Sequence, residues 1–253
     1  MRLPNDFTLE MLAVLKRCKR VFGIPPVRAP EFGLPEMENL GTLYGPDKSR
    51  QKTYREWLDL VLDAAAADAP VALATYGSAM VGALVTHRII EEAPRRGLTV
   101  HVSNAISSID GIWADFNIEP FYGFEIWEAT TFVRLGIEPD TRTNLMLPQA
   151  PLFGVTNGPD PQNATMAVSS TVAALRDHLL RFYPADHEVH FVRTGSGVGP
   201  LSIRPNIETL PLAELDHPGG NTMSTLLIPR LGTHRGLDFD RQDQSKALTI
   251  AQN

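Results

Sequence analysis

The sequence predicts an α/β protein built from two α/β domains, and three observations support this expectation. Short apolar runs of the kind found in buried strands alternate with segments of helical periodicity. The chain has 253 residues, which fit one large domain or two compact ones. A stretch with Pro120 and Gly123 interrupts the alternation near residue 120. We therefore expect domains over 1–118 and 119–231, followed by a polar tail over 232–253.

The first half is expected to hold a mainly parallel sheet covered by helices. An apolar stripe with helical spacing predicts a helix over 7–20, which Asp6 would cap. The continuous apolar run over 71–76 follows Pro70 and is typical of a buried parallel strand. The other elements expected in this half are strands over 21–24 and 98–102, and helices over 49–68, 80–95 and 105–116.

The alternation resumes after the break near residue 120. A polar loop rich in proline and glycine precedes an apolar stripe that predicts a long helix over 164–182. The strands expected in this half cover 143–147, 187–193 and 222–228. This second alternating stretch predicts a second α/β domain.

Composition and charge exclude several classes of protein. Hydrophobic residues make up 43% of the chain and charged residues 21%, which is typical of a globular protein. The net charge of −6 argues against a general nucleic-acid binder, which would carry a basic excess. Cys18 is the only cysteine, so a reducing, cytoplasmic location is expected. No apolar run approaches the roughly 20 residues that span a bilayer, so no membrane partner is expected.

Two motifs that suggest a cofactor or a metal have a simpler interpretation. Residues 194–199 read Thr-Gly-Ser-Gly-Val-Gly after a predicted strand, but Pro200 follows and no helical pattern comes next. An inter-strand loop is therefore favoured over a phosphate-binding loop. His187 and His190 fall in one predicted strand, where a spacing of three residues places them on opposite faces. No carboxylate or cysteine cluster accompanies them, so no metal site is expected.

A group of tyrosines and an arginine is the most informative feature of the first half. Arg50 and Tyr54 are four residues apart at the start of a predicted helix, so they lie on one face of it. Tyr76 ends the next predicted strand, at the carboxyl end where ligands bind in open α/β sheets. Tyr44 lies just before the helix. The four side chains could converge on one cleft, although spacing alone favours Tyr54 as a packing residue and Arg50 as a solvated charge.

Several segments, in matching order and without large gaps, resemble the tetrapyrrole methylase superfamily, and within it the borosin-type peptide backbone α-N-methyltransferases. The segments that carry the resemblance are Lys48-Ser49-Arg50 with Tyr54, Tyr76-Gly77, His87-Arg88, Ile106-Ser107, Trp113-Ala114-Asp115-Phe116, Glu128-Ala129-Thr130, Tyr183-Pro184-Ala185-Asp186-His187-Glu188-Val189 and Ser224-Thr225-Leu226-Leu227-Ile228-Pro229. The resemblance implies two α/β domains with the cofactor cleft between them. It also implies S-adenosyl-L-methionine as the cofactor, a separate precursor peptide as the substrate, and a homodimer.

The resemblance further implies which residues take part in the reaction. An amide nitrogen is a poor nucleophile because its lone pair is delocalised into the carbonyl group. Methylation therefore requires removal of the N–H proton and stabilisation of charge on the carbonyl oxygen. By resemblance, Tyr54 accepts the proton and Arg50 binds the carbonyl oxygen, while Tyr76 and Tyr44 complete the pocket.

Cofactor binding is assigned by the same resemblance. The residues expected to border the cofactor are Gly77, Ser78, Ala79, Val81, Ser107, Ser108, Gln149, Ser224 and Thr225. Family members begin with a strand and a glycine-rich G-x-G loop, whereas this chain starts, at Arg2-Leu3-Pro4, just after the position of that loop. The second loop reads Gly77-Ser78-Ala79-Met80, where relatives carry glycine–acid–proline or Gly-His-Pro-Gly. Side chains thus replace glycines that ease close approach of the backbone to a ligand.

Three functional hypotheses follow from these patterns. The first is a methyltransferase that acts on backbone amides of a separate precursor peptide. The second is a non-catalytic relative that binds a peptide or a partner and has an impaired cofactor site, which the two loop departures favour. The third is a methyltransferase that acts on a tetrapyrrole or another small molecule. None of the three involves nucleic acid, a membrane or a bound metal.

Overall fold

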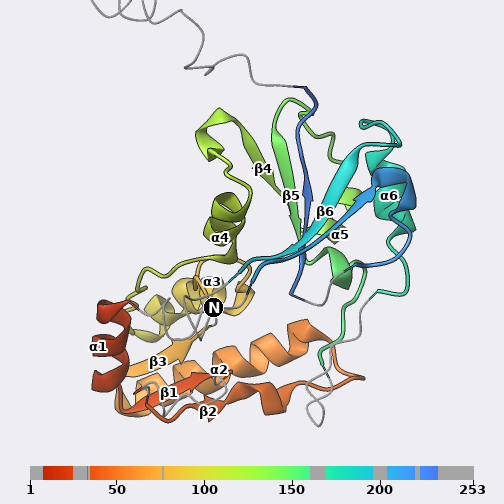
Figure 1. Ribbon diagram of the computed structural model, residues 1–253. Helices are drawn as coiled ribbons and strands as arrows, with labels where there is room; N and C mark the ends of the chain where they lie inside the picture. Colours follow the sequence, from red (N-terminus) through yellow and green to blue (C-terminus); the bar gives the residue numbers. More distant parts are fainter. Residues whose placement is uncertain are drawn as a thin grey trace, which may run out of the picture.

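The computed structural model describes residues 8–24, 33, 35–75, 77–159, 169–195, 204–219 and 223–232. These residues form a mixed α/β structure with two sheets, which confirms the fold class expected from the sequence. The first sheet has the strand order β2-β1-β3, and the second has the order β4-β5-β8-β6-β7. In Figure 1 the first sheet and its helices occupy the lower part of the view and the second sheet the upper part.

The first sheet is parallel throughout, as expected. Its strands are β1 (Arg20–Gly23), β2 (Glu38–Asn39) and β3 (Val71–Ala74). Side chains alternate across it, so Phe22 packs with α2 (Arg50–Asp68) and α3 (Leu84–Glu92) on one face. On the other face Val21 packs with α1 (Leu9–Arg17). The first sheet is thus a layer between helices on both sides.

The second sheet, for which the sequence predicted no strand direction, is mostly antiparallel. Its strands are β4 (Phe124–Ile126), β5 (Asn144–Pro148), β6 (Glu188–Arg193), β7 (Asn206–Pro211) and β8 (Thr225–Ile228). The β4–β5 pair is parallel, whereas β5–β8, β6–β8 and β6–β7 are antiparallel. Apolar alternation locates a strand but does not encode its direction, which depends on the path of the connections.

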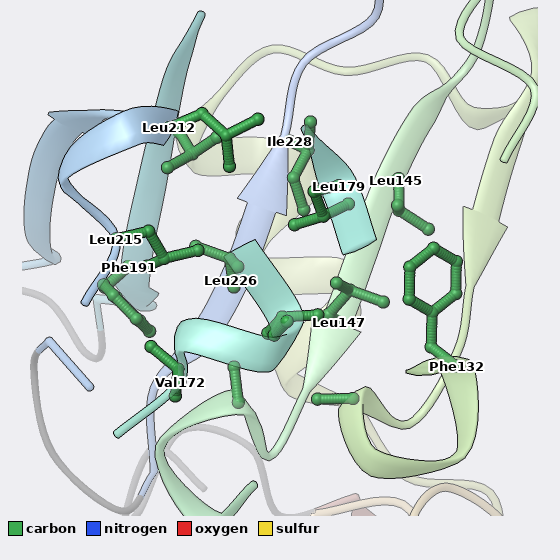
Figure 2. Close-up of a cluster of buried hydrophobic side chains, with 14 of the residues drawn as sticks. Phe132, Leu145, Leu147, Val172, Leu179, Phe191, Leu212, Leu215, Leu226 and Ile228 are labelled. Carbon is green, nitrogen blue, oxygen red and sulfur yellow. The ribbon is translucent and has the colours of Figure 1, made fainter. Parts of the chain in front are cut away.

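Helices cover both faces of the second sheet. Figure 2 shows the larger core, where Leu145, Leu147, Leu226 and Ile228 of the sheet pack against α5 (Ala129–Arg134) and α6 (Ala173–Leu179). On the opposite face, Met146, Val192 and Leu227 pack against Ile112 of α4 (Ser108–Asp115). The side chains alternate strictly between the two cores, as the strand period of two requires.

Two helix starts differ from the sequence-based expectation. The helix expected over 7–20 begins at Leu9, and its cap is Thr8, whose hydroxyl accepts a hydrogen bond from the Met11 backbone N–H at 3.1 Å. Asp6, the expected cap, lies outside the described residues. The helix expected over 105–116 begins at Ser108, because Ser107 and Asp110 form a reciprocal capping box.

Two further expectations were wrong. Residues 98–102 form no strand; Leu98 and Val100 instead pack against the helix cluster of the first half. The long helix expected over 164–182 is α6, of which only Ala173–Leu179 is helical among the described residues. Residues 160–168 lie outside the description. Ser169 and Thr171 stay non-helical because their hydroxyl groups bind the local backbone, which competes with helix formation.

Neither a membrane-spanning helix nor a cluster of metal-ligating side chains occurs in the described residues. No helix in these ranges combines the length and apolar character needed to cross a membrane. Over the same residues, no three histidine, cysteine, aspartate or glutamate side chains gather as a metal ligand set.

Candidate active site around Tyr44 and Tyr54

A pocket opens at the carboxyl edge of the first sheet. Because β1 and β3 are parallel, the residues that follow both strands meet at this edge, which is where open α/β sheets bind ligands. The pocket is lined by Ile24, Tyr44, Tyr54, Trp57, Leu73, Ala74, Thr75, Ser78, Val81, Gly82, Ala83, Leu84 and Val85. Its walls therefore come from the turn before α2, from α2 itself and from the loop that joins β3 to α3.

Three aromatic rings form one wall of the pocket. Tyr54 and Trp57 are three residues apart on α2, so both project from one face of the helix, and their ring centroids are 5.7 Å apart. Tyr44 packs edge-on against both, at 6.4 Å from Tyr54 and 5.2 Å from Trp57. Edge-to-face packing at these distances fixes the rings relative to one another. The Nε1 atom of Trp57 is a buried donor that has no hydrogen-bond partner among the described residues.

The start of α2 is fixed by its own cap and by an ion pair. The Ser49 hydroxyl accepts a hydrogen bond from the Lys52 backbone N–H and caps the helix. The Lys48 ammonium group pairs with Glu56 and donates to the Leu43 carbonyl oxygen at 2.6 Å. These contacts hold the turn that carries Tyr44 against the first two turns of the helix that carries Tyr54.

Arg50 makes a contact that crosses between the two halves of the chain. Its guanidinium Nη2 donates to the Val155 carbonyl oxygen at 2.5 Å, and its backbone N–H donates to the Thr156 carbonyl oxygen at 2.9 Å. Tyr54 lines the pocket, whereas Arg50 is not among its described lining residues. The structure therefore brings Tyr44 and Tyr54 together and places Arg50 beside them, with its side chain bound to the backbone of the second half.

Residues 155–158, which we call the strap, run along the turn before α2. Asn157 forms an antiparallel β-bridge with Ser49. The Gly158 backbone N–H donates to the Lys48 carbonyl oxygen at 3.1 Å, and the Asn157 side-chain amide donates to the Pro46 carbonyl oxygen at 2.8 Å. In Figure 1 the green chain that follows β5 descends from the upper sheet toward the orange turn before α2.

The sequence of the chain matches a known protein family. A sequence profile of the Tetrapyrrole (Corrin/Porphyrin) Methylases matches residues 1–211, which is more than half of the chain. The chain belongs to the tetrapyrrole methylase family. This membership confirms the resemblance seen in the sequence.

One curated relative of this tetrapyrrole methylase is the methyltransferase/ribosomally synthesized type I borosin cyclic peptide precursor sveMA of Serendipita vermifera subsp. bescii. The two are 26% identical over an alignment of 251 positions, which covers 92% of this chain. The chain spans 57% of the length of that relative.

Solved structures share the fold of this tetrapyrrole methylase at low sequence identity. A conserved hypothetical protein from Aeropyrum pernix K1 is 17% identical, with a TM-score of 0.60 over 92% of this chain and 82% of that chain. The methyltransferase CobJ is 12% identical, with a TM-score of 0.56 over 91% of this chain and 90% of that chain. At these identities the likeness concerns the fold.

The structure gathers the expected cofactor residues of this tetrapyrrole methylase into two groups. One group lies on the loop after β3 and the loop before α4, which approach one another: a Cβ added to Gly77 would lie 3.7 Å from the Ile106 carbonyl oxygen. Its members are Gly77, Ser78, Ala79, Val81, Ser107 and Ser108. Ser78 and Val81 also line the pocket, and Ser107 is the cap of α4.

The second group lies where β5 ends beside the start of β8. Thr225 pairs with Pro148, which precedes Gln149, and Ser224 precedes Thr225. Gln149 has a φ of 62°, a left-handed conformation that is uncommon for a residue with a side chain. Ser224 and Thr225 are both buried. That the two groups border one cleft, as the resemblance implies, stays a prediction, and so does the role of each residue.

The site found in the structure differs from the predicted one at Tyr76 and at Trp57. Tyr76, expected to complete the pocket, lies outside the described residues. Trp57 was missed by the sequence reasoning, although its spacing of three residues from Tyr54 on a predicted helix would have placed it on the same face. The strap carried no local signal, because its partners are more than 100 residues away in the chain.

Proposed function

We propose that this tetrapyrrole methylase transfers the methyl group of S-adenosyl-L-methionine to backbone amide nitrogens of a separate precursor peptide. One observation carries the proposal: Tyr44 and Tyr54 line one pocket at the carboxyl edge of the first sheet, with Arg50 on the same helix as Tyr54. The similarity to a borosin methyltransferase precursor supports a peptide as the acceptor. We include in the proposal a homodimer and domains that meet near residue 120.

The pocket offers groups that suit a peptide bond. Tyr54, in its deprotonated form, would take the amide proton while the nitrogen gains its bond to the methyl carbon and the bond from that carbon to sulfur breaks. Arg50 would bind the carbonyl oxygen, where negative charge develops as the proton leaves. The buried Nε1 donor of Trp57, unpaired among the described residues, is a second group that a bound carbonyl oxygen would satisfy.

The residues present suit the cofactor in their chemistry. S-adenosyl-L-methionine supplies an electrophilic methyl group when bound, and it carries hydroxyl, ammonium and carboxylate groups that need polar partners. The loop after β3 offers the hydroxyl groups of Thr75 and Ser78 at the pocket, and Gly77 adopts a left-handed φ of 95° that exposes its backbone. The buried hydroxyl groups of Ser224 and Thr225 lie in the second group of residues.

A tetrapyrrole or another small molecule is the second candidate acceptor. The family description, which names corrin and porphyrin methylases, favours it. A macrocycle has no backbone amide, however, and therefore no need of a proton acceptor of the kind that Tyr54 would provide. We accordingly rank the peptide first.

The replacement Tyr54→Phe tests the peptide proposal, because it removes the hydroxyl group and keeps the ring that packs against Trp57. Single-turnover methylation of a cognate peptide should fall by about 10²–10⁴-fold, the usual contribution of a general base. Affinity for S-adenosylhomocysteine, measured by calorimetry, should barely change.

The matched control is Tyr122→Phe, which removes a hydroxyl group from the second half, far along the chain from the pocket residues; it should methylate at the wild-type rate. Near-normal turnover by Tyr54→Phe, with a loss of about 0.5–1.5 kcal/mol in stability, would instead assign the hydroxyl a packing role. A wild-type protein that gives no heat with S-adenosylhomocysteine would favour the non-catalytic hypothesis.

A further inference from the structure

The strap connects the end of β5, next to Gln149, with the turn before α2 that carries Tyr44. It begins six residues after Gln149, at the end of β5, and it continues the short 3-10 helix η5 (Ala150–Leu152). At its other end it contacts Tyr44 and the start of α2. The second half of the chain thus contacts Tyr44, one wall of a pocket whose described lining residues all belong to the first half.

Gly158 is a point of close contact between the strap and Tyr44, one of the pocket residues. It is buried, and a Cβ built on it would lie 2.5 Å from the Tyr44 Cδ1 atom and 3.2 Å from Cγ. Cβ atoms are essentially never found so close to other heavy atoms, so the ring and the backbone of Gly158 are packed with no room for a methyl group. The φ of Gly158 lies outside the left-handed range, so the backbone conformation does not require glycine at this position. The contact with the Tyr44 ring does.

The strap also binds the Arg50 side chain and so restricts its position. The Val155 carbonyl oxygen accepts from Nη2, and a guanidinium group bound to a carbonyl in this way loses much of its rotational freedom. The hydrogen bonds of Thr156 and Gly158 to the backbone on either side of Ser49 hold the strap in register with the turn. One short segment therefore contacts both Tyr44 and Arg50.

We propose that the strap is a positioning element for the acceptor side of the site, and that Gly158 acts through the Tyr44 ring. This inference rests on the proposed function, since it concerns the residues assigned to the acceptor amide. The strap sets the position of the Tyr44 ring through Gly158 and the position of the Arg50 guanidinium through Val155. A peptide amide is methylated at full rate only when both groups are held in this way.

The replacement Gly158→Ala tests the proposal, with Gly45→Ala as its matched control. A Cβ on Gly45 would lie 3.4 Å from the Lys48 Cβ, which is ordinary contact, so the control adds the same methyl group to the turn that the strap contacts without displacing the ring. Gly158→Ala should lower kcat/KM for a cognate peptide by about tenfold to a hundredfold, as a misplacement of about 1 Å does. The affinity for S-adenosylhomocysteine should stay within about twofold of the wild-type value, because the strap contacts the acceptor side. Gly45→Ala should match the wild type in both.

A spectroscopic readout follows the ring itself. The chain has five tyrosines, so incorporation of 3-fluorotyrosine gives five fluorine NMR resonances, and the variant Tyr44→Phe assigns that of Tyr44. Gly158→Ala should shift this resonance, and Gly45→Ala should shift it much less. In a Tyr44→Ala background the added methyl group has no ring to displace, so Gly158→Ala should cause no further loss of rate or of melting temperature.

The outcomes separate this inference from the proposed function. An unshifted Tyr44 resonance in Gly158→Ala, or a wild-type kcat/KM in that variant, would overturn the inference while leaving the methyltransferase proposal intact. An equal loss of rate in the Tyr44 and Tyr44→Ala backgrounds would also overturn it. A wild-type protein that binds S-adenosylhomocysteine but methylates no peptide would overturn the proposed function.

Discussion

Strands β5 and β8 of the second sheet are buried more deeply than β3, the strand of the first sheet that leads into the pocket, although both sheets lie between helices. All four residues of β8 are buried, and the middle three residues of β5 have no exposed surface. In the first sheet, by contrast, every residue of β3 is only half-buried. The residues that follow β3 line the pocket, and a binding pocket needs surface that a filled core would remove.

The two halves therefore contribute different properties: the second half contributes most of the stability, and the first half contributes the pocket. The second half, its sheet and helices together, supplies most of the fully buried apolar side chains in the described residues, and apolar burial is the main source of folding stability. The first half holds Tyr44 and Tyr54, and a pocket opens at the edge of its sheet. The strap connects the two halves, so the more deeply buried second half holds Tyr44 and Arg50 of the first half in place.

The largest difference between the halves should appear when a leucine is truncated in each sheet. Leu226→Ala removes a side chain with no exposed surface from the core in Figure 2 and should cost about 2–5 kcal/mol of unfolding free energy. Leu73→Ala, in half-buried β3, should cost about 1–2 kcal/mol, because less apolar surface returns to water. Denaturant titrations measure both. Equal costs would contradict the assignment of stability to the second half.

A smaller effect is expected at the cap of α5, in the second half. Burial raises the pKa of Glu128, but hydrogen bonds from the Thr131 hydroxyl and from the backbone N–H groups of Thr130 and Thr131 lower it more, so the pKa falls below its ordinary value. Glu128→Gln weakens these bonds and should cost about 1 kcal/mol at neutral pH.

The pH dependence of this cost has a definite sign. Because the folded-state pKa of Glu128 is lowered, its carboxylate stabilises the fold fully above the unfolded value of about 4.3. That contribution is lost as the pH falls from this value through the folded pKa. The difference in melting temperature between wild type and Glu128→Gln should therefore shrink in acid. A difference that stays constant between neutral pH and strong acid would contradict this account.

The smallest effect is expected at His190, where β6 packs beside α4. Burial lowers the pKa of His190 below its ordinary value, with Glu188 opposing and His187 adding to the shift. The neutral ring, which bonds Thr209 through Nδ1, is thus favoured in the folded state. Stability should be complete above the unfolded pKa of about 6.5 and should decline as the pH falls through it toward the folded pKa. Melts from neutral pH to mild acid should show this decline in wild type and less of it in His190→Gln.

Much of the fold could be predicted from apolar patterns, and the exceptions have physical reasons. The pattern located β1, β3, β5, β6 and β8 because most of their side chains are apolar and are buried or half-buried. β7 was missed because four of its six residues are exposed at the edge of the sheet, which leaves no apolar signal. Residues 98–102 have strand-like alternation, but pairing requires a neighbouring strand, and none of the described strands lies against them.

The candidate site could be predicted only in part. Tyr54 and Arg50 share a helix, so their proximity follows from a spacing of four residues. The meeting of Tyr44 with Gly158, and of Arg50 with Val155, depends on how the two halves pack, which no local pattern encodes. Sequence reasoning therefore found the chemical groups and missed the segment that holds them.

The most direct test of the central claim follows the methyl group into the product. Wild-type protein is incubated with S-adenosyl-L-methionine that carries a trideuterated methyl group and with a library of unmodified peptides, and tandem mass spectrometry locates the label. We expect the label on a backbone amide nitrogen. Label found on a side chain, or transfer to a tetrapyrrole offered in parallel while every peptide stays unmodified, would contradict the assignment of the tyrosine pocket to backbone amides.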